Sequence, residues 1–598
     1  MPSPLSTNPR LNRFRGAKRG MKPADPARRC VVVGYTLAVA LTVAMLGLLG
    51  RVVQLQLAPS PRVAQLLDSQ TGSTPLAARR GSLLDRRGRV VAATRVAHRL
   101  FVDPLLIVDR PIFADVVAHE LGYSPVEIEK ALHRRPDSRF IVIDERIGDE
   151  KLAAVREADI PGLAVQPYLV RDYPQEDLAG QLVGFVGRDG DGLEGVERDL
   201  ETQLEGEPGR VRTVRDARGR RMWITPDRYE PNRDGQPVRL SIDLTIQAIA
   251  QRELAAAVDH YRAESGQMVV MDPVTGEVLA IALVPTFDPG EFRDSTPEQR
   301  KNRAVTDVFE PGSIFKPIVW AGLTARGLAD PDETVDCTEA GYYVSPRGRA
   351  LRDAHGLGEL TWDEVLVQSS NIGMFIAAQR TGVEELHEIV RRFGFGRETG
   401  SGLPGELPGL VNPLKRWNHY SQSSIPMGQE IAVTGLQMTR AFCAFASDGS
   451  MPVPTTRAVG RSAESYAVVR ERVLPPAVAE HTRRVLRRVV TEGTGRKADS
   501  ELYAIFGKTG TAQLPNFKEG GYHQDRYVSS FVAGAPVQSP RLVVGCFIQD
   551  PDKSIGHYGG AVAGPPVRRV IEQSLLYLEV PPGGAARRAD GLARARRD

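Results

Sequence analysis

The 598-residue chain has few cysteines and lacks the short motifs that mark common metal sites. Its four cysteines, at positions 30, 337, 443 and 546, form no CxxC or Cys/His spacing typical of zinc. A dense disulfide framework is therefore excluded, a single bridge remains possible, and buried free thiols are the expected state. The sequence also has no HExxH motif and no GxSxG elbow, which argues against zinc proteases and Ser-His-Asp hydrolases. We expect no metal and no cofactor.

The chain also has little net charge, +4 at pH 7, but cations are concentrated at its two ends. Residues 1–29 hold eight Lys and Arg against one acidic residue, and residues 581–598 hold five Arg against two Asp. A basic end can bind nucleic acid, but an uncharged segment directly follows the first end and favours a membrane flank. We expect a cytoplasmic basic tail at 1–29, a disordered Arg-rich tail at 581–598, and no nucleic-acid partner.

A single long apolar run follows the basic end. Residues 30–50 read CVVVGYTLAVALTVAMLGLLG and carry no charge. A helix of ~20 such residues, rising ~1.5 Å per residue, crosses a hydrocarbon core of ~30 Å. A cleaved signal peptide is the alternative, but its apolar region is usually only ~7–15 residues long. We expect residues 30–52 to be a signal-anchor helix that spans the membrane once and contacts its lipids, with the N-terminus in the cytoplasm and the rest outside.

Two regions of different character follow the apolar run. From about 59 to 236, short apolar runs alternate with Arg-Gly and Asp-Gly turns, which indicates an irregular, strand-rich module. The stretch at 231–237, PNRDGQP, reads as a linker. We therefore place one domain at 53–235 and a second, more regular domain at 236–580.

The second domain has strands at both ends and helices between them. Residues 243–262 have helical apolar spacing with Asp243 as a candidate cap, and residues 266–283 predict a β-hairpin around a Pro-Val-Thr-Gly turn. Residues 527–536 and 541–551 predict a second strand pair, while 300–450 is mainly helical. This order predicts an α+β domain in which helices cover an antiparallel sheet.

The first candidate for chemistry is a Ser-x-x-Lys motif at 313–316. Pro311-Gly312 precedes a helical run, which puts Ser313 in its first turn and Lys316 one turn further on the same face. A serine hydroxyl becomes a good nucleophile only when a base takes its proton, and burial can make a lysine that base. Alone the motif is weak, because chance matches are expected and an exposed polar helix face is the alternative.

Two further motifs follow in the chain. Ser369-Ser370-Asn371 lies between two apolar helical stretches, where helix capping is an equally good explanation. Lys508-Thr509-Gly510-Thr511 follows a short β-like run. A phosphate-binding loop is the rival interpretation of Gly507-Lys508-Thr509, but that motif needs a glycine where this chain has Leu502.

Together, Ser-x-x-Lys, Ser-x-Asn and Lys-Thr-Gly in this order resemble the penicillin-recognising serine acyltransferases. Longer stretches resemble the class B penicillin-binding proteins: NRAVTDVFEPGSIFKP (302–317), GQEIAVTGLQMTRAFCAFASDG (428–449) and MDPVTGEVLAIALVPTFDPGEF (271–292) in the second domain. RRGSLLDRRGRVVA (79–92) and DGLEGVERDLETQLEGEPG (191–209) resemble the pedestal, or dimerisation-type, domain of that class. The resemblance implies a transpeptidase (penicillin-binding) domain at 236–580.

The resemblance implies a function and a role for each motif residue. The reaction would be peptidoglycan cross-linking by a serine D-Ala-D-Ala transpeptidase, whose nucleophile Ser313 attacks the carbonyl between the two terminal D-alanines. The implied roles are Lys316 as general base, Ser369 as proton relay, Asn371 as holder of the substrate amide, Lys508, Thr509, Gly510 and Thr511 as binders of the substrate carboxylate, and the backbone N–H groups of Ser313 and Thr511 as the oxyanion hole.

The same resemblance implies partners and leaves alternatives. Stem peptides ending in D-Ala-D-Ala, β-lactams, a SEDS-type glycosyltransferase and other division proteins would be partners, at the bacterial cytoplasmic membrane. Ser369-Ser370-Asn371 resembles the division-type enzymes, since many elongation-type relatives have Ser-x-Asp there. An elongation-type transpeptidase and a catalytically silent division scaffold are the alternatives, and intact motifs favour an active enzyme.

Overall fold

The computed structural model describes residues 26–58, 71–135, 137–214, 229–459, 468–516 and 518–583. It divides into two compact units, one made of residues 1–76 and 209–231 and the other of residues 77–208 and 232–598. Most of the predicted basic tail at 1–29 and of the Arg-rich tail at 581–598 lies outside the described residues. The two units are therefore taken separately.

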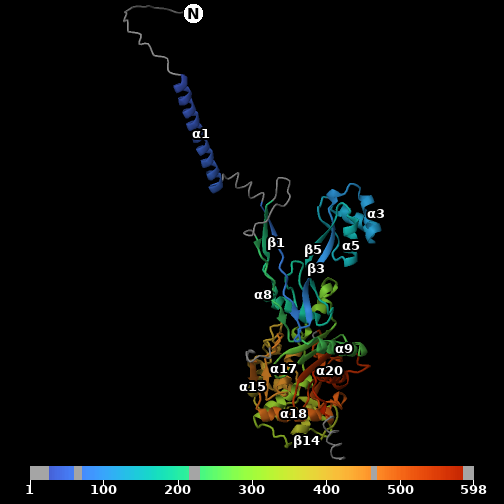
Figure 1. Ribbon diagram of the computed structural model, residues 1–598. Coiled ribbons are helices and arrows are strands. Elements are labelled where there is room, and N and C mark those ends of the chain that lie inside the picture. The colour runs from blue at the N-terminus through green and yellow to red at the C-terminus, as the bar shows by residue number, and fades with distance from the viewer. Residues whose placement is uncertain are drawn as a thin grey trace, which may run out of the picture. The chain divides into compact units, whose positions relative to one another are not determined.

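The first unit contains the apolar helix α1, Pro26–Leu57 (Figure 1). Among the described residues it is the one helix long and apolar enough to cross a membrane, and its membrane-length segment runs from Ala27 to Leu57. The helix thus extends beyond the predicted 30–52. This unit also has a three-stranded antiparallel sheet of β1 (Thr71–Leu76), β6 (Gly209–Val214) and β7 (Tyr229–Glu230), with β6 in the middle.

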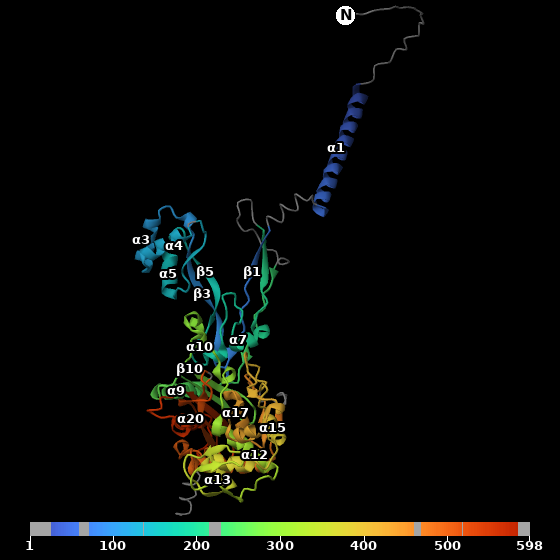
Figure 2. The same ribbon diagram turned by 180° about the vertical axis from the view of Figure 1, so that it is seen from behind.

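The N-terminal part of the second unit is built on two long antiparallel strands, β3 (Val90–Val102) and β5 (Leu163–Asp172). Three helices, α3, α4 and α5, pack with these strands around a separate core that includes Phe113, Ile128 and Leu132 (Figure 2). The sequence pattern did not indicate these helices. The elements of this part are η1 (Pro104–Leu106), α3 (Arg110–Leu121), α4 (Pro125–Arg134), β4 (Ile141–Asp144), α5 (Asp149–Ala158), α6 (Gly180–Val183), α7 (Gly195–Asp199) and α8 (Glu201–Leu204).

The C-terminal part is organised around a five-stranded antiparallel sheet in the order β10-β9-β21-β20-β19. Its strands are β9 (Ser265–Met271), β10 (Val278–Val284), β19 (Phe506–Pro515), β20 (Tyr522–Ala535) and β21 (Leu542–Gln549). Both predicted strand pairs are confirmed, since β9 pairs with β10 and β20 with β21. The sheet leaves β19 at one edge.

Helices cover both faces of this sheet, as the α+β prediction requires. Helices α9 (Leu244–His260) and α20 (Gly564–Tyr577) share one core with one face, and α17 (Gly435–Cys443) packs against the other. Asp243 caps α9 as predicted, because its side chain accepts a hydrogen bond from the Thr245 backbone N–H. All four cysteines are free thiols, and those outside α1 are buried.

Between β10 and β19 the chain is mainly helical, with short hairpins inserted. The helices are η3 (Pro289–Asp294), α10 (Pro297–Arg300), α11 (Arg303–Thr306), η4 (Gly312–Phe315), α12 (Lys316–Ala325), α13 (Trp362–Gln368), α14 (Asn371–Ala378), α15 (Val383–Arg392), η5 (Leu414–Arg416), α16 (His419–Ser424), η6 (Ile425–Met427), α18 (Pro476–Thr491) and η7 (Arg496–Ala498); α19 (Gly559–Val562) follows β21. The short strands are β11 (Thr334–Asp336), β12 (Tyr342–Val344), β13 (Ala350–Arg352), β14 (Glu359–Thr361), β15 (Leu410–Val411), β16 (Ile431–Ala432), β17 (Ser450–Pro452) and β18 (Arg470–Arg472).

The two parts of the second unit share one core. Leu83 and Val91 of the N-terminal part are fully or almost fully buried in the same cluster as Val269 and Phe315 of the C-terminal part. Strand β2 (Leu83–Leu84) also pairs in parallel with β8 (Val238–Arg239), across the predicted linker. The strand that directly follows the linker is therefore part of a packed seam.

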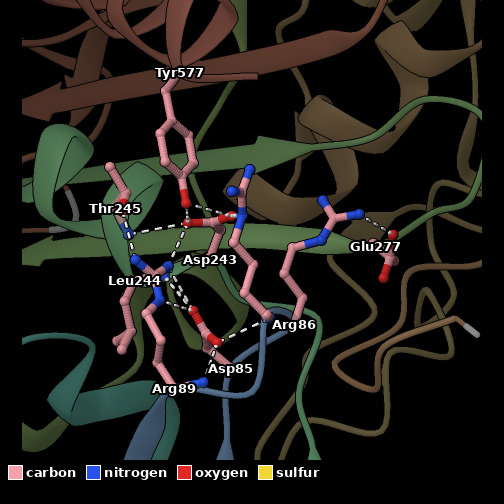
Figure 3. A network of polar contacts seen from close by, with 9 residues as sticks. Asp85, Arg86, Arg89, Asp243, Leu244, Thr245, Glu277 and Tyr577 are labelled. Carbon is pink, nitrogen blue, oxygen red and sulfur yellow. Dashed lines mark hydrogen bonds and ion pairs between the residues drawn. The ribbon is translucent and has the colours of Figure 1, made fainter. Parts of the chain in front are cut away.

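An ionic network around two buried carboxylates holds this seam together (Figure 3). Arg89, in the turn after β2, lies 2.6 Å from Asp85 Oδ2 and 2.7 Å from Asp243 Oδ1. Tyr577, the last residue of α20, donates a hydrogen bond of 3.0 Å to the same Asp243 oxygen. Both carboxylates are completely buried, so the network replaces the water that each of them loses. One turn of the N-terminal part is thereby fixed to α9 and α20.

Candidate active site

The Ser313 turn has a different local structure from the predicted one. Ser313 lies in the 3₁₀ turn η4, and Lys316 is the first residue of the α-helix α12 that continues it. Pro317 sits at the start of α12, where its missing N–H removes no intrahelical bond. Ser313 and Lys316 therefore lie one turn apart as expected, in a helix that begins with a tighter turn.

Two glycines let the Ser313 turn lie directly against strand β19. Gly312 has a φ of +56°, and a Cβ atom there would lie 3.2 Å from the Cβ of Ala512. A Cβ on Gly510 would lie 3.1 Å from the carbonyl oxygen of Pro311. The absence of side chains at both positions thus brings Ser313 next to the Lys-Thr-Gly-Thr segment, which forms part of β19 itself and not the loop after it.

The Ser-Ser-Asn motif lies at the junction of α13 and α14, as predicted. Ser369 ends α13 in the left-handed conformation, with a φ of 62°. The Ser370 hydroxyl caps α14 by accepting a hydrogen bond of 2.9 Å from the Gly373 N–H. Ser370 is thus the capping residue that the sequence suggested, and Ser369 and Asn371 on either side of it are available for the site.

Hydrogen bonds join side chains from all three motifs. Lys316 Nζ donates to Asn371 Oδ1 at 2.7 Å and to the Ser369 carbonyl oxygen at 2.5 Å, and it lies 3.3 Å from Ser369 Oγ. Lys508 Nζ lies 2.8 Å from the same Ser369 Oγ. Ser369 Oγ therefore sits between two lysine nitrogens, in a position to pass a proton from one side of the site to the other.

Both lysines are completely buried, and burial shifts their pKa values strongly. Removal from water lowers the pKa of Lys316 to about 8, and the negative charge of Asp353 partly opposes this shift. Burial also lowers the pKa of Lys508 well below its usual value, and the nearby charge of Lys316 adds to this effect. A neutral amine, which can act as a base, is thus accessible to Lys316 near neutral pH.

The two threonines after Lys508 have different partners. The Thr509 hydroxyl lies 2.7 Å from the Thr494 hydroxyl, and the Thr511 hydroxyl accepts a hydrogen bond of 2.9 Å from the Gly559 N–H. That bond uses only a lone pair of Thr511, which leaves its hydroxyl proton available to an incoming carboxylate. Of the two, Thr511 is the better placed donor.

Sequence reasoning missed Asp353, which follows β13. Its Oδ2 accepts a hydrogen bond of 2.6 Å from the Ser370 hydroxyl, and its Oδ1 accepts from the backbone N–H groups of Asn371 and Ile372. The carboxylate therefore holds the first turn of α14 in place and puts a negative charge near Lys316. An aspartate separated by eighteen residues from the motif that it supports gives no local signal in the sequence.

Among the described residues, no group of three or more His, Cys, Asp or Glu side chains could hold a metal ion.

Comparison with known proteins decides the family. The model of the penicillin binding protein transpeptidase domain matches residues 266–572, and that of the penicillin-binding protein dimerisation domain matches residues 75–240. The chain belongs to the class B penicillin-binding proteins. The first match contains all three motifs of this penicillin-binding protein, and the second contains the seam residues Asp85 and Arg89.

Individual relatives resemble this penicillin-binding protein over most of its length. It is 31% identical to the probable peptidoglycan D,D-transpeptidase PenA of Neisseria meningitidis, over 91% of this chain and 92% of that protein. It is 29% identical to the peptidoglycan D,D-transpeptidase FtsI of Escherichia coli, over 95% and 96% of the two chains. A crystal structure of penicillin-binding protein 3 from Mycobacterium tuberculosis with aztreonam superposes with a TM-score of 0.65 at 28% identity, covering 85% of this chain and 98% of that one.

Proposed function

We propose that this protein cross-links peptidoglycan stem peptides through an acyl-enzyme formed on Ser313. The observation that carries the proposal is the hydrogen-bonded set of Lys316, Ser369, Asn371 and Lys508 beside the Ser313 turn, in which a buried amine has a pKa near 8. A silent scaffold would gain nothing from two completely buried lysines, because burial of an ammonium group is costly.

In the first half-reaction, Ser313 Oγ attacks the carbonyl carbon between the two terminal D-alanines while neutral Lys316 takes its proton. The backbone N–H groups of Ser313 and Thr511 bind the oxyanion. Collapse of the tetrahedral intermediate breaks the amide bond, and a proton delivered through Ser369 lets the terminal D-alanine leave as an amine.

In the second half-reaction, an amine of a neighbouring stem peptide attacks the ester on Ser313. As this amine attacks, its proton passes to neutral Lys316. The new amide is the cross-link, and Ser313 leaves with the proton that Lys316 has taken up. Asn371 holds the donor peptide's amide in both half-reactions. In the first, Lys508 and Thr511, with Thr509 and Gly510 shaping the strand, bind the carboxylate of the terminal D-alanine before it leaves. A β-lactam would be attacked in the same way and would remain on Ser313 as an ester.

The setting of this reaction is part of the proposal. Similarity to FtsI and the Ser-Ser-Asn sequence support a role at the division septum. Helix α1 supports a single-pass membrane anchor, with residues 1–29 in the cytoplasm, 53–235 as pedestal and 236–580 as transpeptidase domain outside. A SEDS-type glycosyltransferase, contacted through 30–52 and the pedestal, is the partner we propose for this setting.

Covalent labelling of the full chain in detergent with a fluorescent penicillin tests the central step. The wild type should form a stable adduct, and Ser313→Ala should form none. A purified lipid-linked substrate with a D-Ala-D-Ala stem should then give dimeric stem peptides only with the wild type. Folded wild type that forms no adduct would sink the proposal and favour the scaffold.

A further inference from the structure

Strand β19 continues past the active site into a part that is much less buried. Lys508 is completely buried, whereas residues 511–516 of the same hairpin are only partly buried. Here β19 ends at Pro515, which pairs with Tyr522 at the start of β20, and the register shifts between Gln513 and Pro515. This outer half of the β19–β20 hairpin, residues 511–516 and 518–527, needs contacts beyond the sheet to keep one position.

A single carboxylate supplies such a contact. Tyr522 donates its hydroxyl proton to Glu310 Oε2 at 2.8 Å. The other oxygen of Glu310 accepts a hydrogen bond of 2.9 Å from the backbone N–H of Glu430. Glu310 thus joins the outer hairpin to the loop before β16, and it does so three residues before Ser313.

The main chain on both sides of Glu310 is itself held in place. Phe309 and Val433 exchange two backbone hydrogen bonds, of 3.0 and 2.9 Å, and the Gly312 N–H donates to the Gly428 carbonyl at 3.0 Å. The main chain at Glu310 is therefore fixed relative to the Ser313 turn. Through the two hydrogen bonds of its side chain, Glu310 connects that turn to the outer half of the hairpin.

We propose that Glu310 is a positioning residue for transpeptidation. By holding Tyr522, it sets the distance between β19 and the Ser313 turn, and hence the distance between the two N–H groups, of Ser313 and Thr511, that bind the oxyanion. Oxyanion stabilisation depends steeply on donor distance, so a small displacement of β19 slows acylation. The inference rests on the proposed function, because its measurement is the acylation of Ser313.

Tyr522→Phe removes the hydroxyl and little else, and Tyr527→Phe on the same strand is the matched control. Tyr527 donates its hydroxyl to the Gln524 carbonyl at 2.9 Å, within its own strand. In the full chain, Tyr522→Phe should slow the first-order acylation step with a fluorescent penicillin by about tenfold and change the noncovalent dissociation constant by less than about twofold. Tyr527→Phe should acylate as the wild type does.

Two variants of Glu310 separate the hydrogen bond from the charge. In Glu310→Gln the amide oxygen can accept from the Glu430 N–H while the amide NH₂ donates to the Tyr522 oxygen, so acylation should stay near the wild-type rate. Glu310→Ala should slow acylation as much as Tyr522→Phe does. The double variant that carries both changes should acylate no more slowly than either single variant, because both changes break the same contact.

The outcomes are distinct. A Tyr522→Phe protein that acylates at the wild-type rate, or a Tyr527→Phe protein slowed equally, overturns the positioning role. The positioning role is also overturned if the slowing by Glu310→Ala and the slowing by Tyr522→Phe add fully in the double variant. If the folded wild type forms no adduct, the proposed function itself fails, and this result is separate because it appears before any variant is compared.

Discussion

The low pKa of buried Lys316 predicts how the acylation rate constant depends on pH. With a pKa of about 8, roughly one quarter of the Lys316 amines are neutral at pH 7.5, against about one in a thousand for a lysine with an ordinary pKa of about 10.5. Burial therefore raises the population of the active base roughly two-hundredfold. The acylation rate constant should rise with pH, about tenfold per unit below pH 7, and reach half of its plateau near pH 8.

Asp353→Asn changes this profile in a known direction. The carboxylate of Asp353 stabilises the ammonium form of Lys316, so its removal should lower the pKa of Lys316 and move the rising limb to lower pH. The plateau of the acylation rate should also fall. Asp353 accepts hydrogen bonds with both carboxylate oxygens at the start of α14, whereas asparagine has only one acceptor oxygen. Both effects can be read from one set of curves.

Stopped-flow acylation of the full chain in detergent, from about pH 6 to about pH 10, measures these curves, because these limits lie about two units either side of the expected midpoint. Lys316→Arg serves as the control, because a guanidinium stays charged throughout and should give no measurable acylation. A flat wild-type profile would falsify the assignment of Lys316 as the base. A rising limb that Asp353→Asn moves to higher pH would contradict the electrostatic argument.

Three further changes test the framework around the site. Glu197 is completely buried between two arginines, each at 2.7 Å, so Glu197→Gln should lower the free energy of unfolding by about 3–5 kcal/mol. Glu207→Gln, in an exposed ion pair, should cost less than about 1 kcal/mol, and equal losses in thermal unfolding would refute the burial argument. Tyr577→Phe removes the hydrogen bond to buried Asp243 and should lower the free energy of unfolding by about 1 kcal/mol. Its acylation rate should stay unchanged, and a slower enzyme would show that the seam affects catalysis.

Much of the fold could be predicted because its signals are local. Alternating and continuous apolar runs gave the two strand pairs, and the Asp243 cap marked the start of α9. The three motifs were found as short patterns, and the structure brings Lys316, Ser369, Asn371 and Lys508 together. Helices α3 to α5 were not predicted, because the apolar runs in their sequences are short and interrupted.

What the sequence could not give were contacts between distant residues. Asp353 and Glu310 have ordinary neighbours, and their importance comes only from partners that the fold brings to them. The 3₁₀ turn at Ser313 was missed for a related reason, since its geometry depends on Gly312 packing against β19. Local pattern thus finds the motif residues that the fold brings together, but not the residues that hold them in place.

The core shared across residue 236 limits how this protein can be divided in the laboratory. A fragment that begins there would keep β8 but lose β2, its parallel neighbour, and would expose the surface that Leu83 and Val91 cover. The same holds for chimaeras, because a pedestal grafted from a relative must bring residues that match Asp243 and Tyr577 at the seam. An exchange between relatives therefore has to keep both sides of this seam matched.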